Sequence, residues 1–315
     1  MELIRGLGNL KPHHRGTVAS IGNFDGVHLG HQAVLRDLKA RAEAMQLPST
    51  LVLFEPMPQE YLRPDRAPLR LTRFMEKWPR LDAAGVDRVL CLKFGRTLAE
   101  MPAEEFVQKA LADGLGIRHL TVGDDFRFGK DRRGDFGLLK RAGADAGFQV
   151  ADTASQQADG ERVSSTRIRA LLIEGKMQAA AELLGRPYGL NGRVMHGERL
   201  GRKLGFPTVN LALKRRSPPL SGIFAARVLG IPGGSRDAAA YIGKRSAAGG
   251  DHWVLEAHLP GYEGDLYGRR LEVQFLQRLR EDRHFDSLDA LRVQMQEDVA
   301  AAQAWLAVNV DRRKN

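Results

Sequence analysis

The first half of the chain alternates short apolar runs with amphipathic stretches, and this alternation restricts the fold more than any other feature. "GTVASIGNF" (16–24) and "STLVLF" (49–54) are typical of buried strands, and "HQAVLRDLKARAEAM" (31–45) between them has apolar residues at helical spacing. The same alternation continues through "DRVLCLKF", "IRHLTVG" and "FQVADTA". Strands separated by helices of this length form βαβ units, so we predict a parallel sheet with helices on both faces.

From "LLGRPYGLNGRV" (183–194) onwards, short β-rich segments broken by glycine and proline replace the helical pattern. "FPTVNLAL", "GIFAARVLGI", "AAAYIG", "WVLEAHL" and "RLEVQFLQRLR" are spaced as in an antiparallel barrel. A closing amphipathic helix is predicted in "SLDALRVQMQEDVAAAQAWL". Its apolar stripe, expected to pack against the barrel, consists of Leu288, Leu291, Met295, Val299 and Ala302. We therefore predict two domains, residues 1–185 and residues 186–315.

Composition narrows the class of protein. A chain of 315 residues is long enough for two cores. Cys91 is the single cysteine, which excludes a disulfide framework and a cysteine-based zinc site within one chain. No apolar run is long enough to cross a bilayer, and "MELIRGLGNLKPHHRG" lacks the apolar core of a secretion signal. We expect a cytoplasmic protein without a membrane partner.

The formal net charge of +10 is compatible with nucleic acid, a membrane surface or a polyphosphate substrate. No predicted helix or strand shows a continuous basic stripe with interleaved aromatic residues, so we do not expect a nucleic-acid partner. Small molecules are the expected partners. The sequence does not determine the oligomeric state.

The stretch "GNFDGVHLGH" (22–31) lies between the first predicted strand and its helix, at the edge of the sheet where ligands bind. Its glycines let the backbone approach a ligand, and the helix N-terminus offers unpaired N–H groups. His28 and His31 add donors for phosphate oxygens where charge builds up in a transition state. These residues favour a nucleoside triphosphate as ligand. The alternatives are a glycine turn with two surface histidines, and a zinc site for which spacing indicates no third ligand.

Two later stretches extend this candidate site. "VGDDFRFGKDRRGD" (122–135) follows a predicted strand and mixes aromatic residues with charged ones. "ERVSSTRIRALL" (161–172) places three hydroxyls before a helical run, where they either cap the helix or bind a second phosphate. The P-loop and dinucleotide fingerprints are missing, which argues against those classes.

Four segments in this order, "GNFDGVHLGHQ", "FEPMPQEYL", "VGDDFRFG" and "RVSSTRIR", resemble the adenylyltransferase module of bacterial bifunctional riboflavin kinase/FAD synthetases. The resemblance implies a Rossmann-like nucleotidyltransferase domain with an H-x-G-H motif, in which His28 and His31 bind ATP phosphates and stabilise the transition state. The other ATP-binding residues implied are Gly22, Asn23, Phe24, Asp25, Gly26, Asp125, Arg162, Ser165 and Thr166. The residues that the resemblance places near the flavin are Pro56, Pro58, Phe126 and Phe128. The alternative is that these four are ordinary loop and core residues.

The second half carries its own candidate site in "GRVMHGERLGRKLGFPTVN" (192–210). A glycine-rich basic loop can wrap a triphosphate through backbone amides and side chains. Thr208 and Asn210 offer neutral oxygens on one face of a strand, which suits Mg²⁺ held jointly with nucleotide phosphates. A solvated loop without a ligand is the alternative.

"GRKLGFPTVN" resembles the G-R-x-L-G-F-P-T-A-N signature of the riboflavin kinase module. The resemblance implies that Thr208 and Asn210 hold Mg²⁺, and that Glu256 in "VLEAHL" takes the proton from the ribityl 5′-hydroxyl. An outward-facing strand carboxylate is the alternative for Glu256. The ATP-binding residues implied are Gly201, Arg202, Gly205, Thr208 and Asn210.

The chain departs from this family's pattern at a few positions. Val209 replaces an alanine, and "YIGKRSAAGG" (241–250) stands where the family reads N-I-G-x-R-P-T. Tyr241 thus replaces asparagine, and Asp282 replaces a common glutamate. These changes affect the expected kinase site more than the adenylyltransferase site.

The resemblance therefore implies two successive reactions, with Mg²⁺ as cofactor and ATP as co-substrate. The kinase module phosphorylates riboflavin to FMN, and the adenylyltransferase module converts FMN and a second ATP to FAD and pyrophosphate. The alternative is a monofunctional adenylyltransferase whose barrel is weak or inactive as a kinase.

Overall fold

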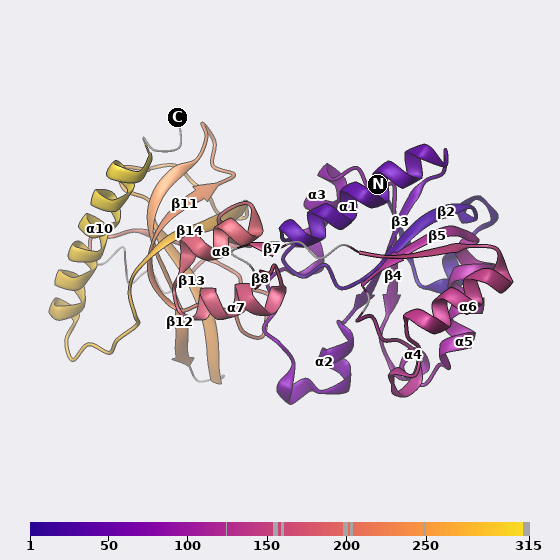
Figure 1. Ribbon diagram of the computed structural model, residues 1–315. Coiled ribbons are helices and arrows are strands. Elements are labelled where there is room, and N and C mark those ends of the chain that lie inside the picture. The colour runs from indigo at the N-terminus through magenta and orange to yellow at the C-terminus, as the bar shows by residue number, and fades with distance from the viewer. Residues whose placement is uncertain are drawn as a thin grey trace. The chain divides into compact units, whose positions relative to one another are not determined.

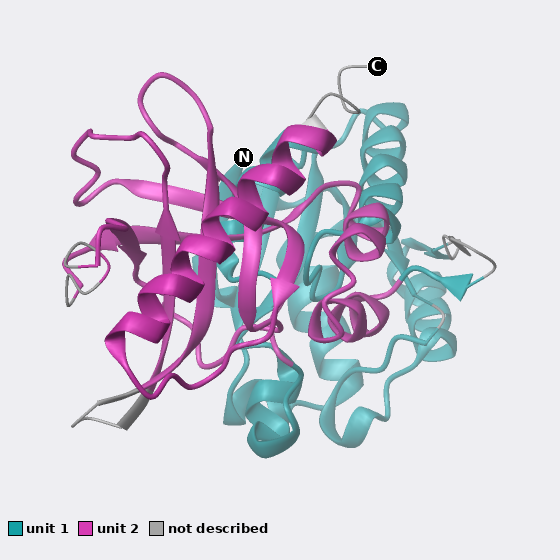
Figure 2. Cartoon of the chain, turned by 90° about the vertical axis from the view of Figure 1, so that its left-hand side faces the viewer, with its two compact units in different colours: residues 1–68, 72–163 teal, residues 69–71, 164–315 magenta. Residues whose placement is uncertain are grey.

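The computed structural model describes residues 1–123, 125–153, 157–158, 161–197, 201, 204–247 and 250–310 (Figure 1). The chain forms two compact units, shown in different colours in Figure 2. Unit 1 comprises residues 1–68 and 72–163, and unit 2 comprises residues 69–71 and 164–315.

Unit 1 contains a six-stranded sheet in which every neighbouring pair is parallel, as the strand–helix alternation predicts. In spatial order the strands are β1 (Glu2–Arg5), β4 (Arg88–Lys93), β3 (Ser49–Glu55), β2 (Thr17–Ile21), β5 (Ile117–Val122) and β6 (Gln149–Asp152). Every residue of β2 is buried, because the strand lies in the middle of the sheet between two layers of helices. The edge strand β1 was not predicted from the sequence.

Helices cover both faces of this sheet (Figure 1). Leu35, Leu38 and Leu81 belong to the core on one face, and Phe106, Leu111 and Leu139 to the core on the other. The helices of unit 1 are α1 (Leu29–Ala44), α2 (Pro58–Leu62), α3 (Phe74–Ala83), α4 (Arg96–Ala99), α5 (Ala103–Phe106), the π-helix η4 (Val107–Leu115) and α6 (Phe136–Ala146). Smaller elements are the 3₁₀ turns η1 (Leu7–Asn9), η2 (Pro12–His14), η3 (Pro64–Arg66) and η5 (Lys130–Arg132), and the hairpin of β7 (Gln157–Ala158) and β8 (Glu161–Arg162).

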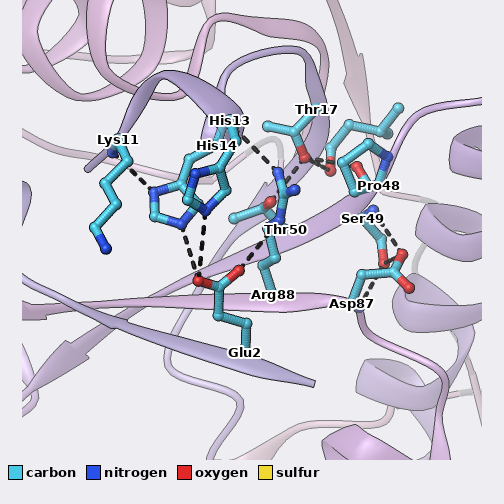
Figure 3. Close-up of polar contacts among 11 residues, drawn as sticks. Glu2, Lys11, His13, His14, Thr17, Pro48, Ser49, Thr50, Asp87 and Arg88 are labelled. Atoms are coloured by element: carbon cyan, nitrogen blue, oxygen red, sulfur yellow. Dashed lines mark hydrogen bonds and ion pairs between the residues drawn. The ribbon is translucent and has the colours of Figure 1, made fainter. Parts of the chain in front are cut away.

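A polar cluster ties the edge strand β1 to the 3₁₀ turn η2 (Figure 3). The backbone N–H of Lys11 donates to Nδ1 of His14 (2.9 Å), and Nε2 of His14 lies 3.0 Å from Oε1 of Glu2. Because Nδ1 accepts a hydrogen bond, the proton of the neutral ring sits on Nε2 and is donated to Glu2. Ligand atoms of Glu2, His13 and His14 lie within 4.8 Å of one another, but the proton fixed on Nε2 of His14 opposes a metal ion there.

Replacing His14 by alanine is expected to lower the free energy of unfolding by about 1–3 kcal/mol, because it removes the buried imidazole that accepts from the N–H of Lys11 and bonds to the carboxylate of Glu2. The bond from His14 is the main cause that lowers the pKa of Glu2. That stabilisation is present above the unfolded-state pKa of Glu2 and is lost as pH falls through its folded-state pKa. His14→Ala should therefore also make the free energy of unfolding depend less on pH in the acid range. Urea unfolding at several pH values measures both effects. The exposed His13 serves as the matched control, and an equal loss in His13→Ala would contradict the prediction.

Unit 2 is built on a closed antiparallel barrel with strand order β10, β13, β12, β11, β14, β9, which confirms the predicted architecture. The strands are β9 (Tyr188–Met195), β10 (Thr208–Leu211), β11 (Gly222–Leu229), β12 (Arg236–Ala247), β13 (Gly250–His258) and β14 (Arg270–Arg280). Phe224 and Phe275 fill the core, with their ring centroids 5.1 Å apart. The helices are α7 (Ser165–Ile173), α8 (Met177–Leu184) and α10 (Leu288–Val310).

The predicted stripe on α10 is only partly a core stripe. Ala302, together with Leu306, packs against Ala225 and Leu276 of the barrel. Leu288 is 59% exposed, contrary to prediction. Leu291, Met295 and Val299 instead line a cavity, which leaves them half-buried. The helix therefore closes the barrel with its C-terminal half and borders an open pocket with its N-terminal half.

The compact units do not divide where the sequence pattern changes, at 185/186. Helices α7 and α8 cluster with the barrel, and α8 contacts β9 and β14. Residues 69–71 join the same unit because Arg169 donates to the carbonyl of Leu69 (2.6 Å) and Tyr188 donates to the carbonyl of Leu71 (2.9 Å). The long continuous part of unit 2 thus begins at residue 164 and takes in two helices that continue the pattern of the first half.

Candidate functional site

The loop between β2 and α1 is held in a tight turn at the carboxyl edge of the parallel sheet. Phe24 and Val27 have φ angles of 48° and 43°, a left-handed conformation that is strained for residues other than glycine. Lys77 of α3 donates to the carbonyl oxygen of Asn23 (2.7 Å), and the N–H of Gly26 donates to Oγ1 of Thr72 (2.8 Å). Side chains from outside the loop therefore stabilise this conformation.

Asp25 takes part in the hydrogen bonds that hold this loop in place. Its carboxylate accepts hydrogen bonds from the N–H (2.8 Å) and the hydroxyl (3.2 Å) of Thr72, and the residue is 2% exposed. The structure thus gives Asp25 a role in shaping the loop. A direct contact between Asp25 and ATP stays a prediction.

The two histidines of the H-x-G-H motif form one unit at the start of α1. His28 is the N-cap residue, and its Nδ1 accepts from the N–H of His31 (3.3 Å). The two rings stack with centroids 3.6 Å apart, and Phe24 packs 4.9 Å from the His31 ring. A Cβ atom on Gly30 would approach the His28 ring to 3.1 Å, so a larger residue would press on that imidazole. The spacing of the motif therefore places both imidazoles together.

Burial lowers the pKa of His31 well below its usual value, and the positive charges of His28, Lys77 and Arg162 lower it further. Nδ1 of His31 is buried and has no hydrogen-bond partner among the described residues. The ring is therefore neutral at pH 7 in the free protein. A site where several positive groups act on one imidazole is suited to a polyanion such as a triphosphate.

Asp125 and Arg162 are brought together, with 3.4 Å between Oδ2 and Nη1. Ser165 and Thr166 are the first two residues of α7, which belongs to unit 2. There Ser164 caps the helix and accepts from the N–H of Arg167 (3.2 Å), as expected for a hydroxyl at a helix start. The part of Ser165 and Thr166 in a phosphate clamp stays a prediction.

The four residues expected near the flavin take different positions in unit 1. Pro56 follows a cis peptide bond at the end of β3, and Pro58 is the first residue of α2. Phe126 and Phe128 stack with ring centroids 5.4 Å apart. Phe128 belongs to the hydrophobic core, whereas Phe126 is half-buried against it. Of the two rings, Phe126 is the more accessible to a ligand.

In unit 2, three of the predicted kinase residues, Gly201, Thr208 and Glu256, line a cavity of about 220 Å³. Asn210 lines a second pocket, which shares Arg245 with the first. Asn210 on β10 lies directly opposite Glu256 on β13, and Thr208 lies two residues away on the same face. Arg245 holds Glu256 through two contacts, Nη1–Oε1 at 3.0 Å and Nη2–Oε2 at 3.2 Å. The cavity lining includes Thr208, Tyr241, Arg245, Glu256, Asp282 and Phe285.

The glycine-rich loop before β10 is described only in part. A Cβ atom on Gly201 would lie 3.2 Å from Oγ1 of Thr208, so the backbone there passes close to a predicted magnesium ligand. Gly205 has a φ of 93°, which favours glycine. Arg202 lies outside the described residues. The binding of ATP by Gly201, Arg202 and Gly205 stays a prediction.

Two charged residues of these sites, Lys77 and Arg245, are missing from the sequence-based predictions. Lys77 is 2% exposed, which is rare for a lysine. In a chain with 48 lysines and arginines, no spacing distinguishes these two from solvated ones. Arg245 lies within "YIGKRSAAGG", a stretch already expected to affect the kinase site. That position in the sequence is the signal that could have identified it.

Together, a parallel α/β unit with a histidine pair at a helix start and a barrel with a carboxylate-lined cavity define a phosphorus-group transferase with two sites. The sequence pattern described as FAD synthetase matches residues 10–167, and the one described as riboflavin kinase matches residues 184–306. The chain belongs to the family of bacterial bifunctional riboflavin kinase/FMN adenylyltransferases. It has both a riboflavin kinase and an FMN adenylyltransferase module, so the monofunctional alternative is not favoured.

Relatives that carry the name bifunctional riboflavin kinase/FMN adenylyltransferase include the following three proteins. The protein of Pseudomonas fluorescens is 50% identical over 313 residues, covering 99% of this chain and 100% of the relative. That of Haemophilus influenzae is 43% identical over 97% of this chain and 99% of its own length. That of Escherichia coli (strain K12) is 42% identical over 98% of this chain and 99% of its own length.

A crystal structure described as a macrolide-efflux protein from Streptococcus pneumoniae has the same fold. It superposes with a TM-score of 0.81 at 29% identity, covering 95% of this chain and 97% of that one. Within the part of this chain that the structure describes, no helix is long and apolar enough to span a membrane.

Proposed function

We propose that the barrel cavity phosphorylates riboflavin and that the loop of residues 22–31 adenylylates the FMN so formed. The observation that carries the first assignment is the position of Glu256 opposite Asn210, on the cavity face that also presents Thr208. Phosphoryl transfer to a hydroxyl needs a group that accepts the hydroxyl proton and groups that position the nucleotide phosphates with their metal ion. A carboxylate beside neutral side-chain oxygens can supply both. Both reactions use ATP.

In the kinase reaction, the 5′-hydroxyl of riboflavin attacks the γ-phosphorus of ATP, and ADP leaves. Glu256 accepts the hydroxyl proton, and its carboxylate is held in place by the two contacts from Arg245. Thr208 and Asn210 present oxygen atoms of the kind that Mg²⁺ binds together with nucleotide phosphates. When bound there, Mg²⁺ would neutralise charge on the β- and γ-phosphates.

In the adenylyltransferase reaction, a phosphate oxygen of FMN attacks the α-phosphorus of ATP, and pyrophosphate leaves. No covalent intermediate with the enzyme is needed, because the FMN phosphate is itself the nucleophile. His28 and His31 donate to phosphate oxygens, and Lys77 and Arg162 add positive charge as negative charge builds up in the transition state. Positioning of the two substrates supplies the rest.

The division of these functions between residues 1–185 and 186–315 is supported by the matches to residues 10–167 and 184–306. The FAD synthetase match extends through Ser165 and Thr166, although α7 packs with the barrel unit. A cytoplasmic enzyme that acts only on small molecules stays a prediction from the sequence.

Incubation of the purified protein with riboflavin, ATP and Mg²⁺ is expected to produce FMN first and then FAD. Chromatographic separation of the flavins over time measures both steps. Chelation of Mg²⁺ by EDTA is expected to stop FMN formation, and added Mg²⁺ to restore it. If riboflavin stays unchanged while supplied FMN becomes FAD, the barrel is not an active kinase, and the first half of the proposal is wrong.

A further inference from the structure

A hydrogen bond ties the connection between β14 and α10 (residues 281–287) to the wall of the barrel. The hydroxyl of Tyr241 donates to Oδ2 of Asp282 at 2.8 Å. Tyr241 lies on β12, and its register partner on β13 is Glu256. Tyr241 and Asp282 both line the cavity that contains Glu256. The bond therefore joins the strand beside the proposed base to the chain segment that borders the same cavity.

This connection carries further cavity-lining side chains, Arg283 and Phe285. The guanidinium carbons of Arg280 and Arg283 lie 5.7 Å and 5.0 Å from the centroid of the Phe285 ring. Arg280 also forms two contacts with Asp298 of α10, at 2.8 Å and 2.7 Å. The start of the connection is thus anchored to the helix by Arg280 and to the barrel by Asp282.

Gly243 provides the space that this hydrogen bond needs. A Cβ atom at this position would lie 2.6 Å from Cζ of Tyr241 and 2.9 Å from Oδ2 of Asp282, which is closer than real Cβ contacts allow. Burial raises the pKa of Tyr241 above its usual range, and the bond to Asp282 raises it further. The hydroxyl is therefore protonated at pH 7 and donates to the Asp282 carboxylate.

We propose that the pair Tyr241–Asp282 is a latch that positions riboflavin in the kinase cavity. The latch holds Phe285 and its two flanking guanidinium groups at the cavity. The flat aromatic ring system of riboflavin can then pack against the Phe285 ring. The inference rests on the proposed function of the barrel. Tyr241 and Asp282 are positioning residues, so they act on the KM for riboflavin and not on the transfer step.

Both positions of the latch are departures from the family pattern, since Tyr241 replaces asparagine and Asp282 replaces glutamate. A longer side chain on the strand is matched by a carboxylate that is one methylene shorter on the connection. In this chain the two altered positions meet in a single hydrogen bond.

The test compares Tyr241→Phe, Asp282→Ala and the double variant in riboflavin kinase assays on the full-length protein. Each single variant is expected to raise the KM for riboflavin about tenfold with kcat nearly unchanged, the effect of losing a hydrogen bond to a charged group. The double variant is expected to show no further rise, because both changes remove one interaction. Gly243→Ala should raise KM similarly while removing no polar group. Conversion of supplied FMN to FAD should stay the same in all four.

Tyr262 and Gly264 provide a matched control, because the Tyr262 ring also folds over a glycine two residues away but neither residue lines the cavity. Tyr262→Phe and Gly264→Ala should change KM by less than about twofold. An unchanged KM in Tyr241→Phe, or additive effects in the double variant, would overturn the latch.

Glu256→Gln in the same assay distinguishes the two proposals. If it retains full FMN formation, the kinase site is wrong, whereas if it abolishes FMN formation and Tyr241→Phe has no effect, only the latch is wrong.

Discussion

Glu256→Gln is expected to lower kcat for FMN formation by about 10²–10⁴-fold, the usual contribution of a positioned general base. Glutamine has nearly the same shape and can still accept a hydrogen bond from Arg245, but it cannot take the proton from the 5′-hydroxyl of riboflavin. Adenylylation of supplied FMN is expected to be unaffected, because the histidine site belongs to the other compact unit. Initial rates with riboflavin and with FMN, measured separately by flavin chromatography, test both statements.

Glu263→Gln is the matched control for this prediction. Glu263 is an exposed glutamate of the same unit and does not line the cavity, so its loss should leave both activities unchanged. A kcat for Glu256→Gln close to that of the control would show that Glu256 is not the base. The position of Glu256 opposite Asn210 would then have to serve another purpose, such as holding Arg245.

His31→Gln is expected to lower FAD formation from FMN by about 10²–10³-fold, as for the loss of a donor that stabilises a charged transition state. FMN formation from riboflavin should continue at the rate of the unaltered protein, so FMN should accumulate in a coupled assay. His28→Ala is expected to abolish FAD formation as well, and it also removes the N-cap of α1, which costs about 1 kcal/mol of stability. His28→Asn retains a cap and separates the two effects. Equal losses of both activities in a folded variant would contradict separate sites.

The pH dependence of His31 provides a further check on the same residue. Burial and the neighbouring positive charges keep its folded-state pKa well below 6.5, so kcat/KM for FMN adenylylation should show no break near pH 6.5 caused by this ring. In the unfolded chain the ring binds a proton below about pH 6.5. The stability associated with neutral His31 is therefore lost as pH falls from 6.5 towards the folded-state pKa, and His31→Gln should lack that loss.

The periodicity of the sequence was sufficient to predict the layers of the fold. Fully buried strands such as β2 have continuous apolar runs, and α1 has its apolar residues at helical spacing, so both were predicted from local pattern. Strand β1 was not, because four residues at a sheet edge carry too little pattern. Helices α7 and α8 resemble the sheet-covering helices in sequence, and no local signal shows that they pack with the barrel.

The candidate sites divide along the same line. His28 and His31 are three residues apart at a helix start, so spacing alone brings them together. Asn210 and Glu256 meet because two antiparallel strands pair in one register, and a shift of one residue would turn one of them to the other face. Tyr241 and Asp282, each noted separately as a departure from the family pattern, are revealed as partners only by their hydrogen bond.

The sequence by itself determined the fold class, the family and the local motifs, because these depend on residues close together in the chain. Only the tertiary structure decided what surrounds those motifs: Lys77 and Thr72 behind the loop, Arg245 on Glu256, and the latch at the cavity. The physical reason is that hydrogen bonds and ion pairs act over a few ångströms in space. Which distant residues come that close is set by strand register and helix packing rather than by composition or spacing.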